Sequence, residues 1–180
     1  MELSLTLEQV IDFLLETDLF CHLEPGELGD IVQIMQLQRF RPEQVIFKEG
    51  DEGNAWYVIY AGAARVEKRD LFVPAREVAR LGPHSCFGEM SILDESPRSA
   101  SIFATEDVTA LRFPRELFQM LLEDHSVAAY KLVHAMAKSL CVRQRKMNQQ
   151  LSDLMEQQDT NLEGLRSRMG PMVDESAISE

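Results

Sequence analysis

The first 35 residues place apolar side chains three and four positions apart, which is the spacing of amphipathic α-helices. Thr6 and Gln9 fit a capping box, in which two side chains satisfy free backbone donors at a helix start. The apolar positions that follow are Leu7, Val10, Ile11, Leu14 and Leu15. Pro25 suits the first turn of a second helix. The apolar face of that helix comprises Leu28, Ile31, Val32 and Met35. We therefore expect residues 1–35 to form an N-terminal helical segment.

The pattern changes after residue 35, where short apolar runs alternate with turn residues. These runs predict strands at 44–48, 56–61, 64–68, 76–81, 99–103 and 108–113. Many short strands at this spacing are typical of a β-sandwich or barrel, and no strand–helix–strand alternation indicates a parallel sheet. The expected fold class is mainly β with flanking helices.

Helical spacing returns in the last third of the chain. Pro114 starts a short helix over 114–124, which completes a central domain of residues 36–125. Ser126 can cap a long helix that we expect over 126–163, from about Val127 to about Leu162. The glycines and the proline at 164, 170 and 171 should end this helix and leave a disordered tail at 164–180.

Composition narrows the function classes. The chain has 180 residues, of which 45% are hydrophobic, so it can bury a core of one domain. Its net charge of −12 disfavours direct nucleic-acid binding. Three cysteines far apart in sequence show no zinc spacing and indicate a reducing compartment. No apolar run suits a membrane span, and the N-terminus lacks a signal-peptide pattern. We therefore expect a cytoplasmic protein.

The stretch from Cys86 to Ser101 contains the strongest chemical signal. Gly88 permits close backbone approach, and one helical turn after it would offer free N–H groups to an anion. Arg98, after a proline, can point a planar cation at the same anion. Glu89 can accept hydrogen bonds from sugar hydroxyls. A phosphate donor set with one hydroxyl acceptor suits a ribose phosphate.

These residues occur in the sequence FGEMSILDESPRSAS at 87–101, which resembles the phosphate-binding cassette of the cyclic nucleotide-binding domain family. The segment 49–59 and Gly62 are similar to the family's preceding strands and turn, and the resemblance extends over about residues 15 to 145. It implies a cyclic nucleotide-binding, jelly-roll-like β-roll with N-terminal helices and a long C-terminal helix.

The resemblance also implies a role for each matching residue. Glu89 would accept from the ribose 2′-hydroxyl, and Arg98 would pair with the phosphate oxygens. The other expected contacts are backbone N–H groups of Gly88, Met90 and Ser91, and the hydroxyl or N–H of Ser99. Ser91 departs from the alanine found in many members, although its backbone donor would remain.

The long helix is a second candidate for function. In members with such a helix it closes over the nucleobase, and the corresponding region of this chain is 139–144. Arg143 could stack on the base and Gln144 could pair with its edge. The alternative is that Arg143 is solvated and Gln144 only sets a helix register.

A heptad on this helix predicts a parallel coiled-coil homodimer. Its a positions are Tyr130, Ala137, Gln144, Leu151 and Gln158. Its d positions are Val133, Leu140, Met147, Leu154 and Asn161. The competing interpretation is that the first half of the helix only packs on its own β-roll.

Together these patterns predict a bacterial-type, non-enzymatic sensor of cyclic AMP or, second, cyclic GMP, without catalytic residues, cofactor or metal. The C-terminal helix would transmit binding to an unidentified protein partner, and the chain has no room for a helix-turn-helix domain after it. Two alternatives keep the fold: a nucleotide-free interaction scaffold and a receptor for a cyclic dinucleotide. A phosphodiesterase is disfavoured because the four histidines are scattered.

Overall fold

The computed structural model describes residues 5–69 and 74–169, with the side chains of 159 and 162–169 left undescribed. It has two compact units, and the boundary between them lies between Ala137 and Lys138. The first unit contains every strand of the described residues, and the second continues the last helix.

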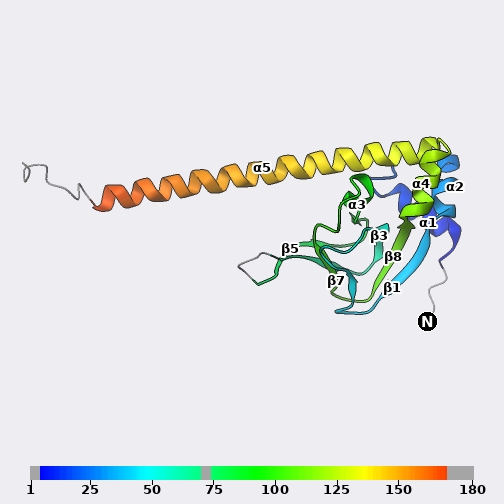
Figure 1. The fold of residues 1–180 in the computed structure, drawn as a ribbon, viewed down its shortest axis with the longest axis horizontal. Helices are drawn as coiled ribbons and strands as arrows, with labels where there is room; N and C mark the ends of the chain where they lie inside the picture. The colour runs from blue at the N-terminus through cyan, green and yellow to red at the C-terminus, as the bar shows by residue number, and fades with distance from the viewer. Residues whose placement is uncertain (1–4, 70–73, 170–180) are drawn as a thin grey trace, which may run out of the picture. The chain divides into compact units, whose positions relative to one another are not determined.

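Eight antiparallel strands form two four-stranded sheets in the first unit (Figure 1). One sheet has the order β1-β8-β3-β6 and the other β2-β7-β4-β5. The strands are β1 (Gln36–Phe40), β2 (Val45–Phe47), β3 (Ala55–Ala61), β4 (Ala64–Lys68), β5 (Arg76–Leu81), β6 (Cys86–Phe87), β7 (Ser101–Ala104) and β8 (Val108–Pro114). This arrangement confirms the predicted β-roll with flanking helices.

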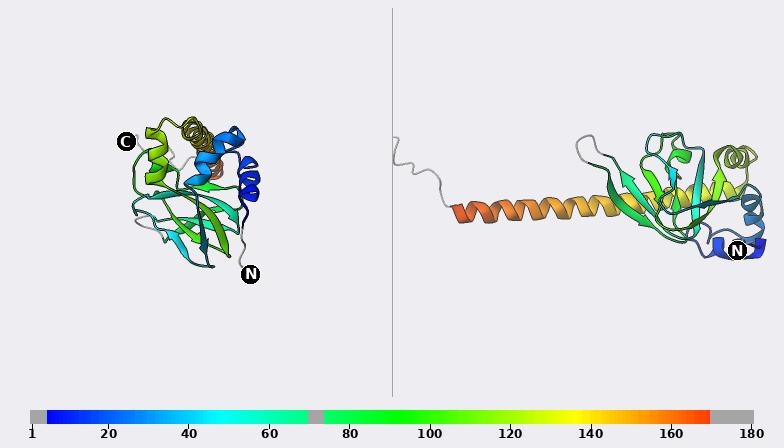
Figure 2. Two further views of the ribbon diagram at one scale, coloured as in Figure 1. Left: turned by 90° about the vertical axis from the view of Figure 1, so that its right-hand side faces the viewer. Right: turned by 90° about the horizontal axis from the view of Figure 1, so that it is seen from below.

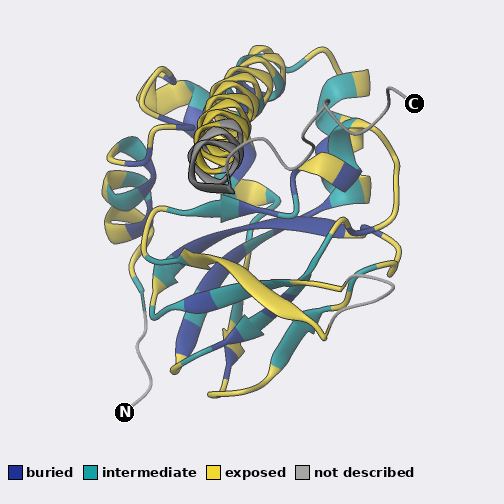
Figure 3. Ribbon diagram, turned by 90° about the vertical axis from the view of Figure 1, so that its left-hand side faces the viewer, coloured by how far each residue is buried: buried dark blue, intermediate teal, exposed yellow. Residues whose placement is uncertain are grey.

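The strand β3 contributes side chains to two different hydrophobic cores, one on each face of its sheet. Its residues alternate in direction, as the two-residue period of a strand requires. Tyr57 and Ile59 belong to the core between the two sheets, whereas Trp56 and Val58 belong to a second core beneath the helices. Residues 55–59 of β3 are all buried, which explains why this stretch reads as a continuous apolar run (Figure 3).

Helical segments of the first unit cover the outer face of the first sheet (Figure 2). The helices of the described residues are α1 (Leu7–Leu15), α2 (Pro25–Gln33), α3 (Met90–Leu93), α4 (Arg115–Glu123) and α5 (Val127–Met169), and α5 belongs to the second unit from Lys138 on. Trp56 stacks on Phe113 with ring centroids 4.1 Å apart, and Phe20 and Phe118 pack around the pair. The predicted capping box of Thr6 and Gln9 is confirmed at the start of α1.

The first turns of α5 belong to this helical core. Ala128, Ala129, Leu132 and Met136 are buried in it. Lys131 donates to Glu27 of α2 at 2.6 Å, and this hydrogen bond lowers the pKa of the Glu27 carboxyl. The first part of α5 therefore packs on its own unit, and the predicted homodimer stays a prediction.

Some predicted boundaries were wrong. β1 and β6 were not predicted, and α5 was expected to end near Leu162, whereas the helix continues through Gly164 to Met169. One glycine inside a helix costs only about 1 kcal/mol, so it does not stop a helix by itself. Gly170 and Pro171, which were also predicted as stop signals, lie outside the described residues, as does the part of the predicted tail 164–180 that follows Met169.

Candidate functional site: the cassette between β6 and β7

The cassette begins at Gly88, directly after β6, with a φ of +77°. This backbone conformation favours glycine. A Cβ at this position would lie 2.7 Å from Nη1 of Arg98, so a larger residue would displace the guanidinium. The single helical turn α3 follows, as the sequence predicted. Gly88 therefore allows the backbone to pass close beside the arginine.

Arg98 is almost completely buried, with 3% of its surface exposed. Its Nη1 donates to the carbonyl of Gly88 and to the hydroxyl of Ser91, each at 2.9 Å. Its Nη2 donates to the carbonyl of Ala55 at 2.6 Å. The guanidinium carbon lies 4.1 Å from the centre of the Phe47 ring, a cation–π contact. These contacts fix the guanidinium in one orientation.

The hydrogen bonds of Arg98 bring only neutral oxygens, and no carboxylate, to its guanidinium. Its Nε is buried and has no hydrogen-bond partner among the described residues. Within the same residues no ion pair involves Arg98. The three acceptors of its hydrogen bonds are neutral oxygens. Burial is the main cause that lowers the pKa of Arg98, and nearby Tyr57 and Asp51 oppose it. A buried cation with a free donor is a site for an anion.

Glu89 is the second buried charged residue of the cassette, with 4% of its surface exposed. Its carbonyl accepts from the N–H groups of Ile92 and Leu93, which closes the turn of α3. The buried polar or charged residues of the described chain are Thr17, Glu89, Ser91 and Arg98. Three of these four come from the cassette.

The remaining predicted residues of the cassette lie at its surface. Met90 is 41% exposed and Ser99 is exposed, and the Ser99 hydroxyl lies 3.7 Å from the Met90 sulfur. Lys68 of β4 donates to the carbonyl of Ser99, which ties the end of the cassette to the neighbouring strand. The structure thus groups Gly88, Glu89, Ser91 and Arg98 tightly, with Met90 and Ser99 at the edge.

Arg143 and Gln144 belong to the second unit, where both are exposed. The Gln144 amide donates to Asn148 one turn later at 3.1 Å. Their predicted role over a nucleobase stays a prediction.

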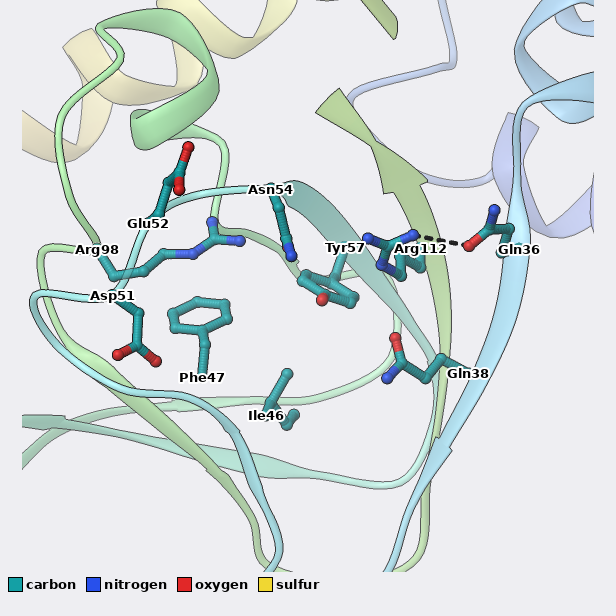
Figure 4. A pocket seen from close by; sticks show the side chains of 10 residues that line it. All are labelled: Gln36, Gln38, Ile46, Phe47, Asp51, Glu52, Asn54, Tyr57, Arg98 and Arg112. Atoms are coloured by element: carbon teal, nitrogen blue, oxygen red, sulfur yellow. Dashed lines mark hydrogen bonds between the residues drawn. The ribbon is translucent and has the colours of Figure 1, made fainter. Parts of the chain in front are cut away.

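A cavity of about 510 Å³ lies beside Arg98 (Figure 4). It is lined by Gln36, Gln38, Ile46, Phe47, Asp51, Glu52, Asn54, Tyr57, Arg98 and Arg112. Figure 4 shows the Arg98 guanidinium above the Phe47 ring and directed toward Asn54. Of the predicted site residues, only Arg98 lines this cavity.

Sequence reasoning missed the partners of Arg98 outside the cassette. Phe47 and the carbonyl of Ala55 hold the guanidinium, and both come from strands far from Arg98 in sequence. The one sequence feature that could have indicated the contact with Phe47 is the position of this residue just before the segment 49–59, which resembles the family.

Among the residues that the structure describes, no group of three or more histidine, cysteine, aspartate or glutamate residues is placed so that it could hold a metal ion. Over the same ranges, the helices lack the length and apolar character that crossing a membrane would need.

Comparison with known proteins shows which family has this sequence and fold. The model of the cyclic nucleotide-binding domain family matches residues 37–125. The cyclic AMP receptor protein of Thermus thermophilus is 36% identical over 122 residues, which is 68% of this chain and 56% of the relative. A cAMP-dependent protein kinase regulatory subunit of Colletotrichum orbiculare is 35% identical over 111 residues, 62% of this chain and 28% of the subunit. The chain thus spans about half or less of these relatives.

Solved structures agree in fold. The Thermus thermophilus catabolite activator protein superposes with a TM-score of 0.68 and 34% identity, covering 77% of this chain and 63% of that one. The N-terminal domain of a Streptomyces coelicolor transcriptional regulator gives a TM-score of 0.65 with 26% identity, covering 76% and 95%. The sequence match, the β-roll and the buried cassette agree, and residues 37–125 of the chain belong to the cyclic nucleotide-binding domain family.

Proposed function

We propose that this protein is a non-enzymatic sensor that binds cyclic AMP, and less tightly cyclic GMP, at the cassette. The observation that carries the proposal is the buried guanidinium of Arg98, which has neutral partners and an unpartnered Nε among the described residues. A cyclic phosphate would supply the missing negative charge and an acceptor oxygen. The two relatives described above are a cyclic AMP receptor protein and a cAMP-dependent protein kinase regulatory subunit. Both names refer to cAMP, which supports this choice of ligand.

Each cassette residue has a role in this proposal. Arg98 binds the phosphate, and Glu89 accepts a hydrogen bond from the ribose 2′-hydroxyl. Backbone N–H groups of Gly88, Met90 and Ser91, together with Ser99, complete the contacts. The first turn of a helix has N–H groups without a partner inside the helix, so α3 can contribute donors in this way.

The proposal extends to α5 as the element that reports binding to a partner protein. The seam of the predicted coiled coil is exposed at Tyr130 (51%), Met147 (58%), Leu151 (58%) and Leu154 (58%). The face of α5 that enters the core contains Leu132 and Met136, and of the seam residues Val133 packs partly against this core. Exposed apolar side chains in a row favour a second copy of the helix as their cover. We therefore propose a homodimer.

The proposed location is the cytoplasm. The three cysteines Cys21, Cys86 and Cys141 lie far apart in sequence, a pattern that is typical of proteins from a reducing compartment.

Calorimetric titration with cyclic AMP, cyclic GMP and cyclic di-GMP, side by side, tests the proposal. We expect saturable binding of cyclic AMP, weaker binding of cyclic GMP and none of the dinucleotide, with every ligand recovered unchanged. Binding of the dinucleotide alone would reassign the protein as a dinucleotide receptor. No binding of any ligand would favour a scaffold, and hydrolysis of the ligand would show an enzyme.

A further inference from the structure

The side chain of Ser91 takes part in the network around Arg98. Its hydroxyl accepts a hydrogen bond from Nη1 of Arg98 at 2.9 Å and donates to the carbonyl of Gly88 at 3.2 Å. The Gly88 carbonyl also accepts from Nη1 at 2.9 Å. Ser91 is 3% exposed, so water does not replace these bonds readily. The three groups form a closed triangle that holds one side of the guanidinium.

The hydroxyl lies against Gly53 in the turn between β2 and β3. A Cβ added at Gly53 would lie 2.1 Å from the Ser91 Oγ and 2.5 Å from its Cβ. The next neighbour, the guanidinium carbon of Arg98, would be at 3.6 Å, an ordinary contact. The space that Ser91 occupies is therefore the space that a side chain at position 53 would need.

The same turn is tied to the cassette by its backbone. The N–H of Arg98 donates to the carbonyl of Asp51 at 2.8 Å, and the N–H of Gly50 donates to the carbonyl of Arg98 at 2.9 Å. Arg115 joins the turn to the far end of the cassette, with contacts to the Gly53 carbonyl at 3.5 Å and to Glu95 at 3.2 Å. The turn is thus a fixed support against which Ser91 can hold the arginine.

We propose that the Ser91 side chain is a positioning residue of the phosphate site, seated over Gly53 so that it holds the Arg98 guanidinium in place for the ligand. This inference rests on the proposed function and assigns a side-chain role where the resemblance implied only a backbone N–H. An alanine at position 91 would keep that N–H but would leave Nη1 with the Gly88 carbonyl alone. The guanidinium would then lose part of its fixed orientation.

The first test measures cyclic AMP affinity in Ser91→Ala. We expect binding about tenfold weaker than in the wild type, which corresponds to about 1.4 kcal/mol. The matched control is Ser101→Ala, because the Ser101 hydroxyl accepts a hydrogen bond from the Glu49 N–H and lies outside the network of Arg98, Ser91 and Gly88. The control should keep wild-type affinity.

A spectroscopic measurement separates positioning from general damage. In nitrogen-15 spectra of ligand-free protein, the Nε–H signal of Arg98 should be sharp in the wild type and in Ser101→Ala, and broadened in Ser91→Ala. An unchanged signal together with unchanged affinity in Ser91→Ala would overturn the proposal.

A double-mutant cycle tests the seating over Gly53 without any ligand. Gly53→Ala should destabilise the wild type clearly but cost much less in a Ser91→Gly background, because both close contacts are then gone. Gly29→Ala is the control, since nothing lies within 4 Å of a Cβ there. Equal costs in both backgrounds would show that Ser91 does not occupy this space. If the wild type bound no cyclic nucleotide but the cycle showed coupling, the proposed function would fail while the contact itself would stand.

Discussion

Glu89, Ser91 and Arg98 are the buried polar side chains of the cassette, and each has a different electrostatic situation. Arg98 is a cation whose hydrogen-bond partners are neutral, and Ser91 links it to the backbone. Burial lowers the pKa of Arg98, and the nearby carboxylate of Glu89 is among the groups that oppose this lowering. A ligand with both an anion and a hydroxyl donor complements this set, whereas an anion alone would meet the carboxylate.

Glu89 should distinguish a ribose from a deoxyribose. A buried carboxylate built around a hydroxyl loses its donor when that hydroxyl is absent, and the unpaired acceptor costs free energy. We expect 2′-deoxy cyclic AMP to bind at least about tenfold more weakly than cyclic AMP, and a tenfold difference in affinity corresponds to about 1.4 kcal/mol. Competition with a fluorescent cyclic nucleotide measures the two affinities.

The control for this comparison is Glu89→Gln, which should bind both ligands with a smaller difference between them. Equal affinity of the wild type for the two ligands would assign Glu89 a structural role.

The sequence predicted the contiguous part of the site and missed the part that only the fold assembles. Gly88, Glu89 and Arg98 lie in one motif, so their chemistry could be read together. Phe47 and the Ala55 carbonyl contact Arg98 only because β2 and β3 meet the cassette in space. A backbone carbonyl carries no residue-type signal, and a phenylalanine in a strand reads as core.

At the scale of elements, the strands with alternating or continuous apolar residues were predicted well. β4 and β5 have the predicted bounds, and β3 and β8 differ by one residue at an end. The strand β1 was missed because Gln36, Gln38 and Arg39 interrupt its apolar pattern. It forms by backbone pairing with β8 from Gln36 to Phe40, which local sequence does not reveal. β6 has only two residues and is defined by its pairing with β3.

The helix α5 has two successive parts, one buried in the core and one exposed, which its sequence did not separate. Met136 is the last fully buried residue of its described part, so the core is complete before Lys138. Beyond it, Val142, Met147, Leu151, Leu154 and Met155 are exposed apolar residues. A chain truncated after Val142 therefore keeps its buried core and loses the distal seam together with Arg143 and Gln144.

We expect this truncated chain to be monomeric and to bind cyclic AMP more weakly, because it lacks the seam and both candidate base contacts. Sedimentation equilibrium measures the oligomeric state, and calorimetry measures the affinity. The full chain is the reference and should be dimeric. A truncated chain that remains dimeric with unchanged affinity would show that the distal helix neither joins the chains nor caps the ligand.

For the whole molecule, the net charge of −12 opposes the binding of an anionic nucleotide. The attraction must therefore come from local groups, of which Arg98 is the buried cation. Screening by salt weakens the repulsion between distant charges but affects a buried contact much less. Nucleotide binding should therefore depend on one guanidinium more than on the overall electrostatic field of the protein.

Titration of cyclic AMP into the wild type and into Arg98→Ala, followed by calorimetry, tests that dependence most directly. Loss of one partner of a desolvated charge pair costs about 2–5 kcal/mol. We predict saturable binding by the wild type and at least about 30-fold weaker binding by Arg98→Ala, at about 1.4 kcal/mol per decade. Circular dichroism should confirm that the variant keeps its fold. Undiminished affinity in a folded Arg98→Ala variant would contradict the assignment of the phosphate site.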